Sequence, residues 1–168
     1  MVKTGKLLKR IFTDLKHVTC LAHMLHNICE KIRVKSKFVD DIIANLKRLL
    51  TKNKDNQEIF KNITGLNIPK FPIITRWGTW LDFINFLFEN YLEILQFIRK
   101  MDEKYESCYG AIVDSDDFKI QIRYCKKFTW LVKIIEEFET RDLSVEQQIE
   151  SLMRTKEKLE DKYLIEYF

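Results

Sequence analysis

The chain has 168 residues, of which 46% are hydrophobic and 12% aromatic, and its net charge is +4. This composition supports one domain-sized hydrophobic core and is too apolar for a disordered chain. The sequence contains only 4 Gly and 2 Pro, which favours long helices over a turn-rich β fold.

No segment of the sequence has the pattern of a membrane-directed element. The basic residues from Lys3 to Arg10 are not followed by the apolar region of a signal peptide. The most apolar stretch, from Trp80 to Ile98, is interrupted by Asp82, Glu89 and Glu93, which disfavours a membrane span. We therefore expect a soluble intracellular protein.

The N-terminal part begins with weak signals and continues with clear helical periodicity. A short helix is expected over Thr4–Phe12, and the faint alternation over Leu15–Cys20 indicates a strand. Apolar residues recur at helical spacing over Leu21–Val34 and again from Phe38 to Leu49. Ser36 lies before the second of these helices and is expected to cap it.

A short helix and an extended connection follow. The residues Asp55–Glu58 resemble a capping box that opens a helix ending near Ile63. Gly65 is well placed to stop this helix, because glycine adopts the left-handed conformation without a steric penalty. Pro69 and Pro72 then favour extended backbone.

The C-terminal half is predicted to be helical as well. A capping box at Thr79–Asp82 is expected to open a helix that runs to about Tyr105, is apolar on most of its circumference and must therefore be buried. Gly110–Ser115 is predicted to form a turn, and Phe118–Phe138 a long amphipathic helix. A capping box at Ser144–Gln147 opens the last helix. The expected apolar face of this helix consists of Val145, Ile149, Leu152, Leu159 and Tyr163.

Charge is distributed unevenly along the chain. Residues 1–80 contain 16 Lys/Arg against 6 Asp/Glu, whereas residues 81–168 contain 13 against 19. The basic half could bind a polyanion such as DNA, or its cations could merely solubilise surface helices. The acidic half, from Asp114 to Glu166, could instead bind a protein partner.

A block of histidines and one cysteine raises the question of a metal site. His17, Cys20, His23 and His26 recur every three residues, and thiolate and imidazole are good zinc ligands. Structural zinc sites usually combine two separated pairs, however, and no second pair follows at a usual spacing. A Cys-His nucleophile is disfavoured too, because the block lacks a third orienting group. The four cysteines, at positions 20, 29, 108 and 125, are expected to be reduced thiols in a packed interior.

Two short motifs resemble elements of hAT-superfamily DNA transposases. Cys20 with His23 matches the Cys-x-x-His element of that family, and Arg76 with Trp77 matches its Arg-Trp element, in the same order and at a compatible spacing. The resemblance extends from Met1 to about Met101.

The resemblance implies a mainly α fold. Residues 1–21 would be a residual piece of a ribonuclease H-like core with at most one strand, and residues 22–168 would be the helical insertion domain. It also implies nuclear localisation and a chain derived from a transposable element.

The resemblance further implies roles for the motif residues. Trp77 would stack on a base flipped out at a DNA end, Arg76 would contact nearby DNA, and Cys20 and His23 would lie beside the nuclease site. Composition alone favours the view that Trp77 and Trp80 are core residues, and we expect Trp80 to be one.

The catalytic carboxylates of the family are expected to lie outside this chain. The parent family holds Mg²⁺ or Mn²⁺ with three acidic residues, and none of the acidic clusters here matches them. Those clusters are Asp40–Asp41, Asp114, Asp116–Asp117 and Glu136–Glu137, and we expect all of them to be surface charge. The sequence therefore predicts a DNA-interacting helical scaffold without catalysis or cofactor, or alternatively a domesticated protein-interaction module.

Overall fold

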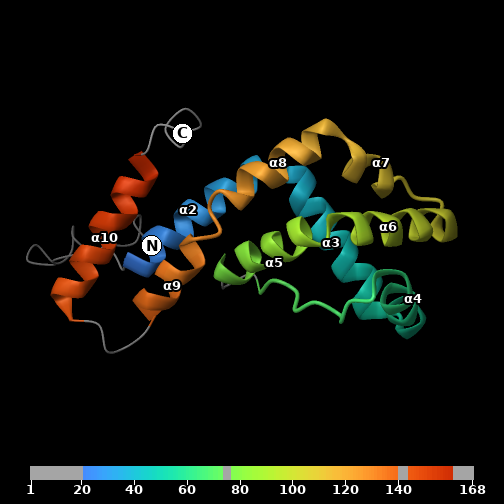
Figure 1. Ribbon diagram of the computed structural model, residues 1–168, viewed down its shortest axis with the longest axis horizontal. Coiled ribbons are helices and arrows are strands. Elements are labelled where there is room, and N and C mark those ends of the chain that lie inside the picture. Colours follow the sequence, from blue (N-terminus) through green and yellow to red (C-terminus); the bar gives the residue numbers. More distant parts are fainter. Residues whose placement is uncertain (1–20, 74–76, 140–143, 161–168) are drawn as a thin grey trace, which may run out of the picture.

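The computed structural model describes residues 21–73, 77–139 and 144–160 (Figure 1). These residues form helices and connections, and they contain no strand. The prediction of a mainly α chain is confirmed. The helix expected over residues 4–12 and the strand expected over residues 15–20 lie outside the described part, so the domain division at residues 21 and 22 stays a prediction.

The described helices follow one another with short connections. In chain order they are α2 (Leu21–Lys35), α3 (Lys37–Lys52), α4 (Lys54–Thr64), α5 (Trp77–Glu89), α6 (Tyr91–Tyr105), α7 (Tyr109–Asp114), α8 (Asp116–Lys126), α9 (Leu131–Glu139) and α10 (Val145–Glu160). None of the helices among the described residues is long and apolar enough to cross a membrane.

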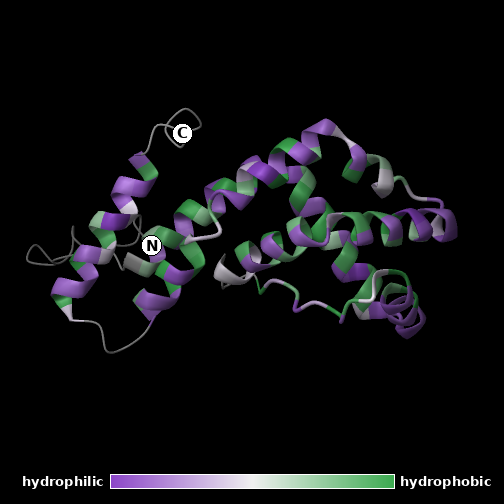
Figure 2. Ribbon diagram, viewed as in Figure 1, coloured by the Kyte–Doolittle hydropathy of each residue, from purple (hydrophilic) through white to green (hydrophobic). Residues whose placement is uncertain are grey.

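One hydrophobic core joins α2 to α9. In Figure 1, α5 and α6 run end to end through the middle of the molecule, α4 packs on α6, and α8 and α9 pack on α5. Aromatic side chains fill this core, and the fully buried ones are Phe60, Phe83, Phe97, Phe118 and Phe128. Figure 2 shows that hydrophilic residues dominate α4 and α10, which lie at the periphery.

The apolar segment after residue 77 forms two helices where one was predicted. It is buried as expected, but α5 ends at Glu89 and α6 begins at Tyr91. At the break, the Nδ2 atom of Asn90 donates to the carbonyl of Phe86 at 2.9 Å, and the backbone N–H of Asn90 donates to the same carbonyl. An Asn side chain that binds the backbone locally competes with the helical pattern, which explains the break.

The segment from Phe118 to Phe138 is also divided. Residues 127–130 form turns, and the N–H of Phe128 donates to the carbonyl of Cys125 at 3.0 Å. These bonds between residues three apart tighten the chain and separate α8 from α9. The apolar residues predicted to lie on one face are nevertheless buried, except Phe138, which is half-buried.

A helix, α7, stands where a turn was predicted at residues 110–115. The carboxylate of Asp102, on α6, accepts the N–H of Tyr109 at 3.2 Å and also the N–H of Gly110. An acceptor at these otherwise unsatisfied donors stabilises the first turn of a helix. The acceptor comes from another helix, so local sequence could not reveal it.

Two of the predicted helix ends are confirmed, namely the glycine that stops α4 and the capping box that opens α10. Gly65 has φ +68° and its N–H donates to the carbonyl of Lys61 at 2.8 Å, as predicted for a helix stop. At α10, the N–H of Gln147 donates to the Ser144 hydroxyl at 3.2 Å, and the N–H of Ser144 donates to the Gln147 side chain at 2.9 Å. This reciprocal pair confirms the predicted capping box.

Two other caps differ from the prediction. Ser36 precedes α3, but its hydroxyl makes no capping bond and instead accepts from the Cys125 thiol at 3.0 Å. The cap of α4 is Asn53, not Asp55, because the Asn53 side chain accepts the N–H of Asp55 at 2.8 Å. The cap of α4 thus lies two residues before the predicted one, and the predicted cap residue of α3 binds a residue of α8 instead.

The inward face of α10 is polar, contrary to the prediction. Ser151 and Thr155 are buried, whereas the predicted members Val145 and Ile149 are exposed. The predicted members Leu152 and Leu159 are half-buried, and Leu159 packs against the core. The predicted member Tyr163 falls beyond the described residues. The hydroxyls on the inward face bond to neighbouring groups, for example Thr155 to the carbonyl of Ser151 at 2.7 Å, so burying them is tolerated.

Candidate nucleic-acid interface around the start of helix α5

The structure describes the surroundings of the predicted DNA-binding residues more fully than the residues themselves. Arg76 and Cys20 lie outside the described ranges, and of Trp77 the structure describes only that α5 begins there. His23 is exposed on α2, where its ring centroid lies 5.9 Å from that of His26.

The connection that leads to Arg76 is attached to the helices at three successive residues. The ring of Phe71 stacks on Phe83 of α5 at 5.3 Å between centroids. The carbonyl of Pro72 accepts from Lys47 of α3 at 3.5 Å. The N–H of Ile73 donates to the Thr79 hydroxyl at 3.0 Å. The chain is thus fixed up to three residues before Arg76.

Thr79 has a different role from the one predicted. The sequence indicated a capping box at Thr79–Asp82, but α5 already begins at Trp77, so Thr79 lies in its first turn. Its hydroxyl accepts the N–H of Ile73 from the preceding connection. This bond ties Ile73, the last described residue of the connection, to the first turn of α5.

Trp80 is a core residue, as predicted, and it anchors α5 to α3. Its side chain is 3% exposed, and its Nε1 atom donates to Asp40 Oδ1 at 3.2 Å. The second oxygen of Asp40 accepts from Arg33 Nε at 3.2 Å. Asp40 is therefore a half-buried link between three helices, where surface charge was predicted.

A shallow pocket of about 220 Å³ adjoins the attached connection. Its lining residues include Arg33, Asp40, Lys47, Pro72, Ile73 and Trp80. Arg33 also lies 3.6 Å from Glu30, so two carboxylates already engage its guanidinium. The other cation that lines the pocket is Lys47, and Lys70 is exposed on the connection.

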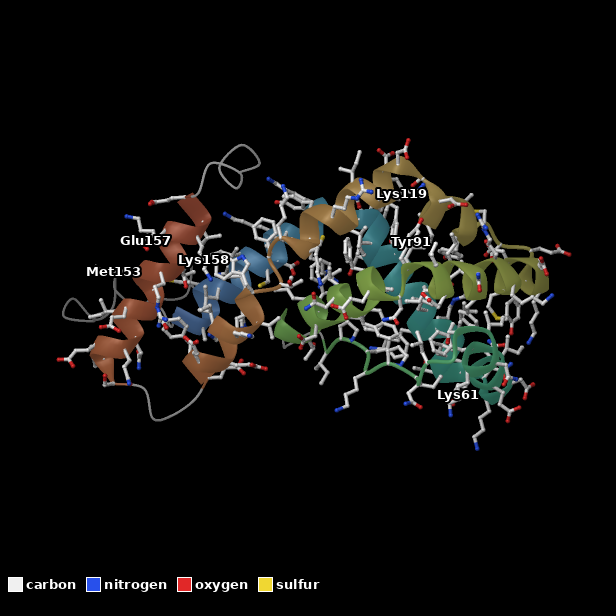
Figure 3. All side chains as sticks on the ribbon, viewed as in Figure 1. Lys61, Tyr91, Lys119, Met153, Glu157 and Lys158 are labelled. Atoms are coloured by element: carbon white, nitrogen blue, oxygen red, sulfur yellow. The ribbon has the colours of Figure 1, made fainter. Side chains whose placement is uncertain are left out.

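Further cations lie on the exposed sides of α3 and α4. They are Arg48, Lys52, Lys54 and Lys61, and Figure 3 shows Lys61 extending from α4 away from the body of the molecule. Exposed lysines and arginines are the groups that contact a phosphate backbone. Cations that only keep a helix soluble are exposed as well, so exposure does not distinguish the two roles. A DNA-binding function therefore depends on the motif residues.

Of the Cys/His block, the structure describes His23, which is exposed, and His26, which is half-buried beside α9. His26 Nε2 lies 3.6 Å from Glu139 Oε1 on α9. Burial lowers the pKa of His26, while Glu139 acts in the opposite direction. Burial raises the pKa of Cys29 to about 12, so this thiol is protonated at neutral pH. Among the described residues, no three His, Cys, Asp or Glu side chains are grouped so as to hold a metal ion.

Several of the acidic clusters take part in local contacts. Asp114 forms an ion pair with Arg99, and Glu137 accepts from the Ser151 hydroxyl at 2.7 Å. Asp116 and Asp117 are exposed in the first turn of α8, where negative charge favours the helix dipole. These clusters therefore contribute to helix ends and helix contacts. Asp102, whose carboxylate accepts from Ser107, Tyr109 and Gly110, was not singled out from the sequence.

Comparison of the chain with protein-family models, with curated proteins and with solved structures finds no match.

Proposed function

We propose that this chain is a DNA-interacting helical scaffold, derived from a hAT-type transposase and lacking its catalytic carboxylates. In this proposal Trp77 stacks on an unpaired base at a DNA end and Arg76 contacts the adjacent phosphate, while Cys20 and His23 lie near the same DNA. The protein would act in the nucleus without a metal cofactor.

The main support for this proposal is the fixed frame on both sides of the Arg-Trp motif. Ile73 is bound to Thr79 before the motif, and Trp80 is buried and bound to Asp40 after it. A stacking residue that is held in place by rigid elements loses little conformational freedom when DNA binds. Lys47, which binds the carbonyl of Pro72, and the exposed Lys70 add positive charge on and beside the connection that precedes the motif.

The test compares the two tryptophans. We expect Trp77→Ala to leave helical content and the unfolding temperature nearly unchanged and to weaken binding to DNA with an unpaired terminal base by about 1 to 3 kcal/mol, the usual value of one base-aromatic stack. Fluorescence titration with labelled DNA measures the affinity, and circular dichroism measures the fold. Fully paired DNA of the same length is the control ligand, for which Trp77→Ala should make little difference.

Trp80→Ala is the matched protein control. It removes a buried aromatic side chain and leaves Asp40 without one of its donors, so it should reduce the free energy of unfolding by roughly 3 to 5 kcal/mol. If Trp77→Ala unfolds the chain, or if it binds both DNA ligands as tightly as the unchanged chain does, Trp77 is not a stacking residue and the proposal fails.

A protein-interaction module remains the alternative, because α10 exposes apolar side chains on its outward side. The salt dependence of the binding affinity distinguishes the two functions. Binding driven by phosphate contacts weakens steeply as salt increases, whereas binding through an apolar helix face does not. A DNA affinity that is unchanged between low and physiological salt would favour the alternative.

A further inference from the structure

The outward side of α10 carries an exposed apolar stripe, which we call the α10 stripe. It consists of Val145, Ile149 and Met153, which are 72%, 49% and 62% exposed. Residues four apart lie on the same side of a helix, so the three side chains form one continuous row. The row is about 12 Å long at the helical rise of about 1.5 Å per residue.

The opposite side of α10 is the one that holds this helix to the molecule. Ser151 donates to Glu137 at 2.7 Å, and the Lys158 ammonium lies 4.9 Å from the ring centroid of Trp130. In Figure 3, Lys158 lies on the side of α10 that faces the other helices, whereas Met153 and Glu157 lie on the outer side. The α10 stripe therefore points away from the core that α9 belongs to.

Three glutamates border the α10 stripe. Glu146, Glu150 and Glu157 are exposed, and at about 100° per residue they fall in a row directly beside Met153. On the other side of the row lies the exposed Lys156, which pairs with Glu160 at 3.6 Å. The outer side of α10 is thus an apolar row with one acidic edge. A complementary surface would need exposed apolar groups with a basic edge.

Such a surface lies along α8, and we call it the α8 groove. Its volume is about 530 Å³, and its lining residues are Lys35, Ile120, Gln121, Arg123, Tyr124 and Lys127. Ile120 is 62% exposed and lies on the wall of this groove. Three of the residues lining the α8 groove are cationic and none is acidic.

The two surfaces agree in length as well as in charge. From Ile120 to Lys127 the chain advances about 10 Å along α8, close to the length of the α10 stripe. Covering the exposed Ile120 with the side chains of the α10 stripe would remove apolar area from water on both sides. The opposite charges at the edges would set the orientation and the partner choice.

We propose that the α10 stripe of one copy of this chain lies in the α8 groove of a second copy. Each copy carries both surfaces, so a reciprocal exchange closes a two-fold symmetric dimer with two identical contacts. This interaction is independent of the proposed DNA contact, which uses the start of α5.

Sedimentation velocity of the purified full chain tests the proposal by charge reversal. The unchanged chain should dimerise with a dissociation constant in the micromolar range. A groove variant carries Arg123→Glu and Lys127→Glu, and a stripe variant carries Glu150→Lys and Glu157→Lys. Each variant alone brings like charges together at both contacts, so each should dimerise at least about tenfold more weakly.

The decisive sample is an equimolar mixture of these two variants. The acidic groove of the first variant then meets the basic stripe of the second, and the unchanged stripe of the first meets the unchanged groove of the second. The mixture should therefore recover dimers that neither variant forms alone. Recovery also shows that both variants are folded, which circular dichroism checks separately.

Matched controls reverse charges on α4, away from both surfaces. Lys61→Glu and Glu58→Lys are exposed changes of the same kind and should leave dimerisation unchanged. Met153→Ser is an additional variant that removes apolar area without altering charge, and it should weaken dimerisation. The proposal is overturned if the unchanged chain is monomeric throughout the micromolar range, if the reversed variants dimerise normally, or if the mixture stays monomeric.

Discussion

The cysteines show how position decides the chemistry of one residue type. Cys29 and Cys125 are buried free thiols, as the sequence predicted, but Cys108 is exposed, contrary to that prediction. Burial raises the pKa of Cys29 to about 12 and that of Cys125 to about 11. At neutral pH both buried thiols are therefore protonated as well as inaccessible, and the Cys125 thiol also donates to Ser36.

These differences predict the order of thiol alkylation. In the native chain at neutral pH, iodoacetamide should modify Cys108 much faster than Cys29 or Cys125, because reaction needs both access and thiolate. Peptide mass spectrometry at increasing reaction times measures each site. Denaturant should remove the difference. Rapid native modification of Cys29 would show that the contact between α2 and its neighbours is looser than the structure indicates.

At the scale of the helix, the caps depend on geometry that a short motif only partly predicts. Asn53 precedes α4 and Asp55 lies in its first turn. Both are residue types that cap helices. The structure selects Asn53, whose side chain reaches the N–H of Asp55 at 2.8 Å while its own backbone is extended. The helix therefore starts two residues earlier than a cap at Asp55 would allow.

The cap can be tested by substitution. Asn53→Ala should lower the free energy of unfolding by about 1 kcal/mol, because the first turn of α4 loses an acceptor. Asn62→Ala is the matched control, since Asn62 is exposed within the same helix and alanine favours helix there. Urea unfolding measures both changes. An equal loss for the two variants would mean that the Asn53 bond does not stabilise α4.

For the molecule as a whole, stability is concentrated in the helices that share the core. Buried apolar residues come from α2 to α9, whereas α10 adds only the half-buried Leu159 to this cluster. The buried residues of α10 are Ser151 and Thr155, which release little apolar area from water. We infer that α10 opens at a lower free energy than the core helices.

Hydrogen exchange should reveal this difference. Amides of α3, α5 and α6 should exchange slowest, and those of α10 markedly faster, when measured by mass spectrometry on the Arg123→Glu, Lys127→Glu variant. That variant is chosen because dimerisation would protect α10. Exchange in α10 as slow as in α5 would show that the polar contacts with α9 hold this helix as firmly as the core does.

Local chemistry alone determined several features of this protein. Helical periodicity predicted the mainly α fold and the buried residues of α3 such as Ile42 and Leu46. The sequence also predicted the left-handed Gly65 and the capping box at Ser144. Each of these features depends on neighbours within four residues. The burial of Trp80 followed from its place in an apolar segment.

Tertiary structure decided the features whose partners are distant in sequence. Asp102 caps α7 from another helix, Ser36 binds Cys125 and not its own helix, and Trp80 binds Asp40. The same is true of the frame around the Arg-Trp motif, which depends on Phe83 and other residues beyond the motif. A periodic pattern reports which side of a helix is apolar, but only packing decides which polar groups meet, and here those contacts set the helix boundaries and hold the connection that precedes α5.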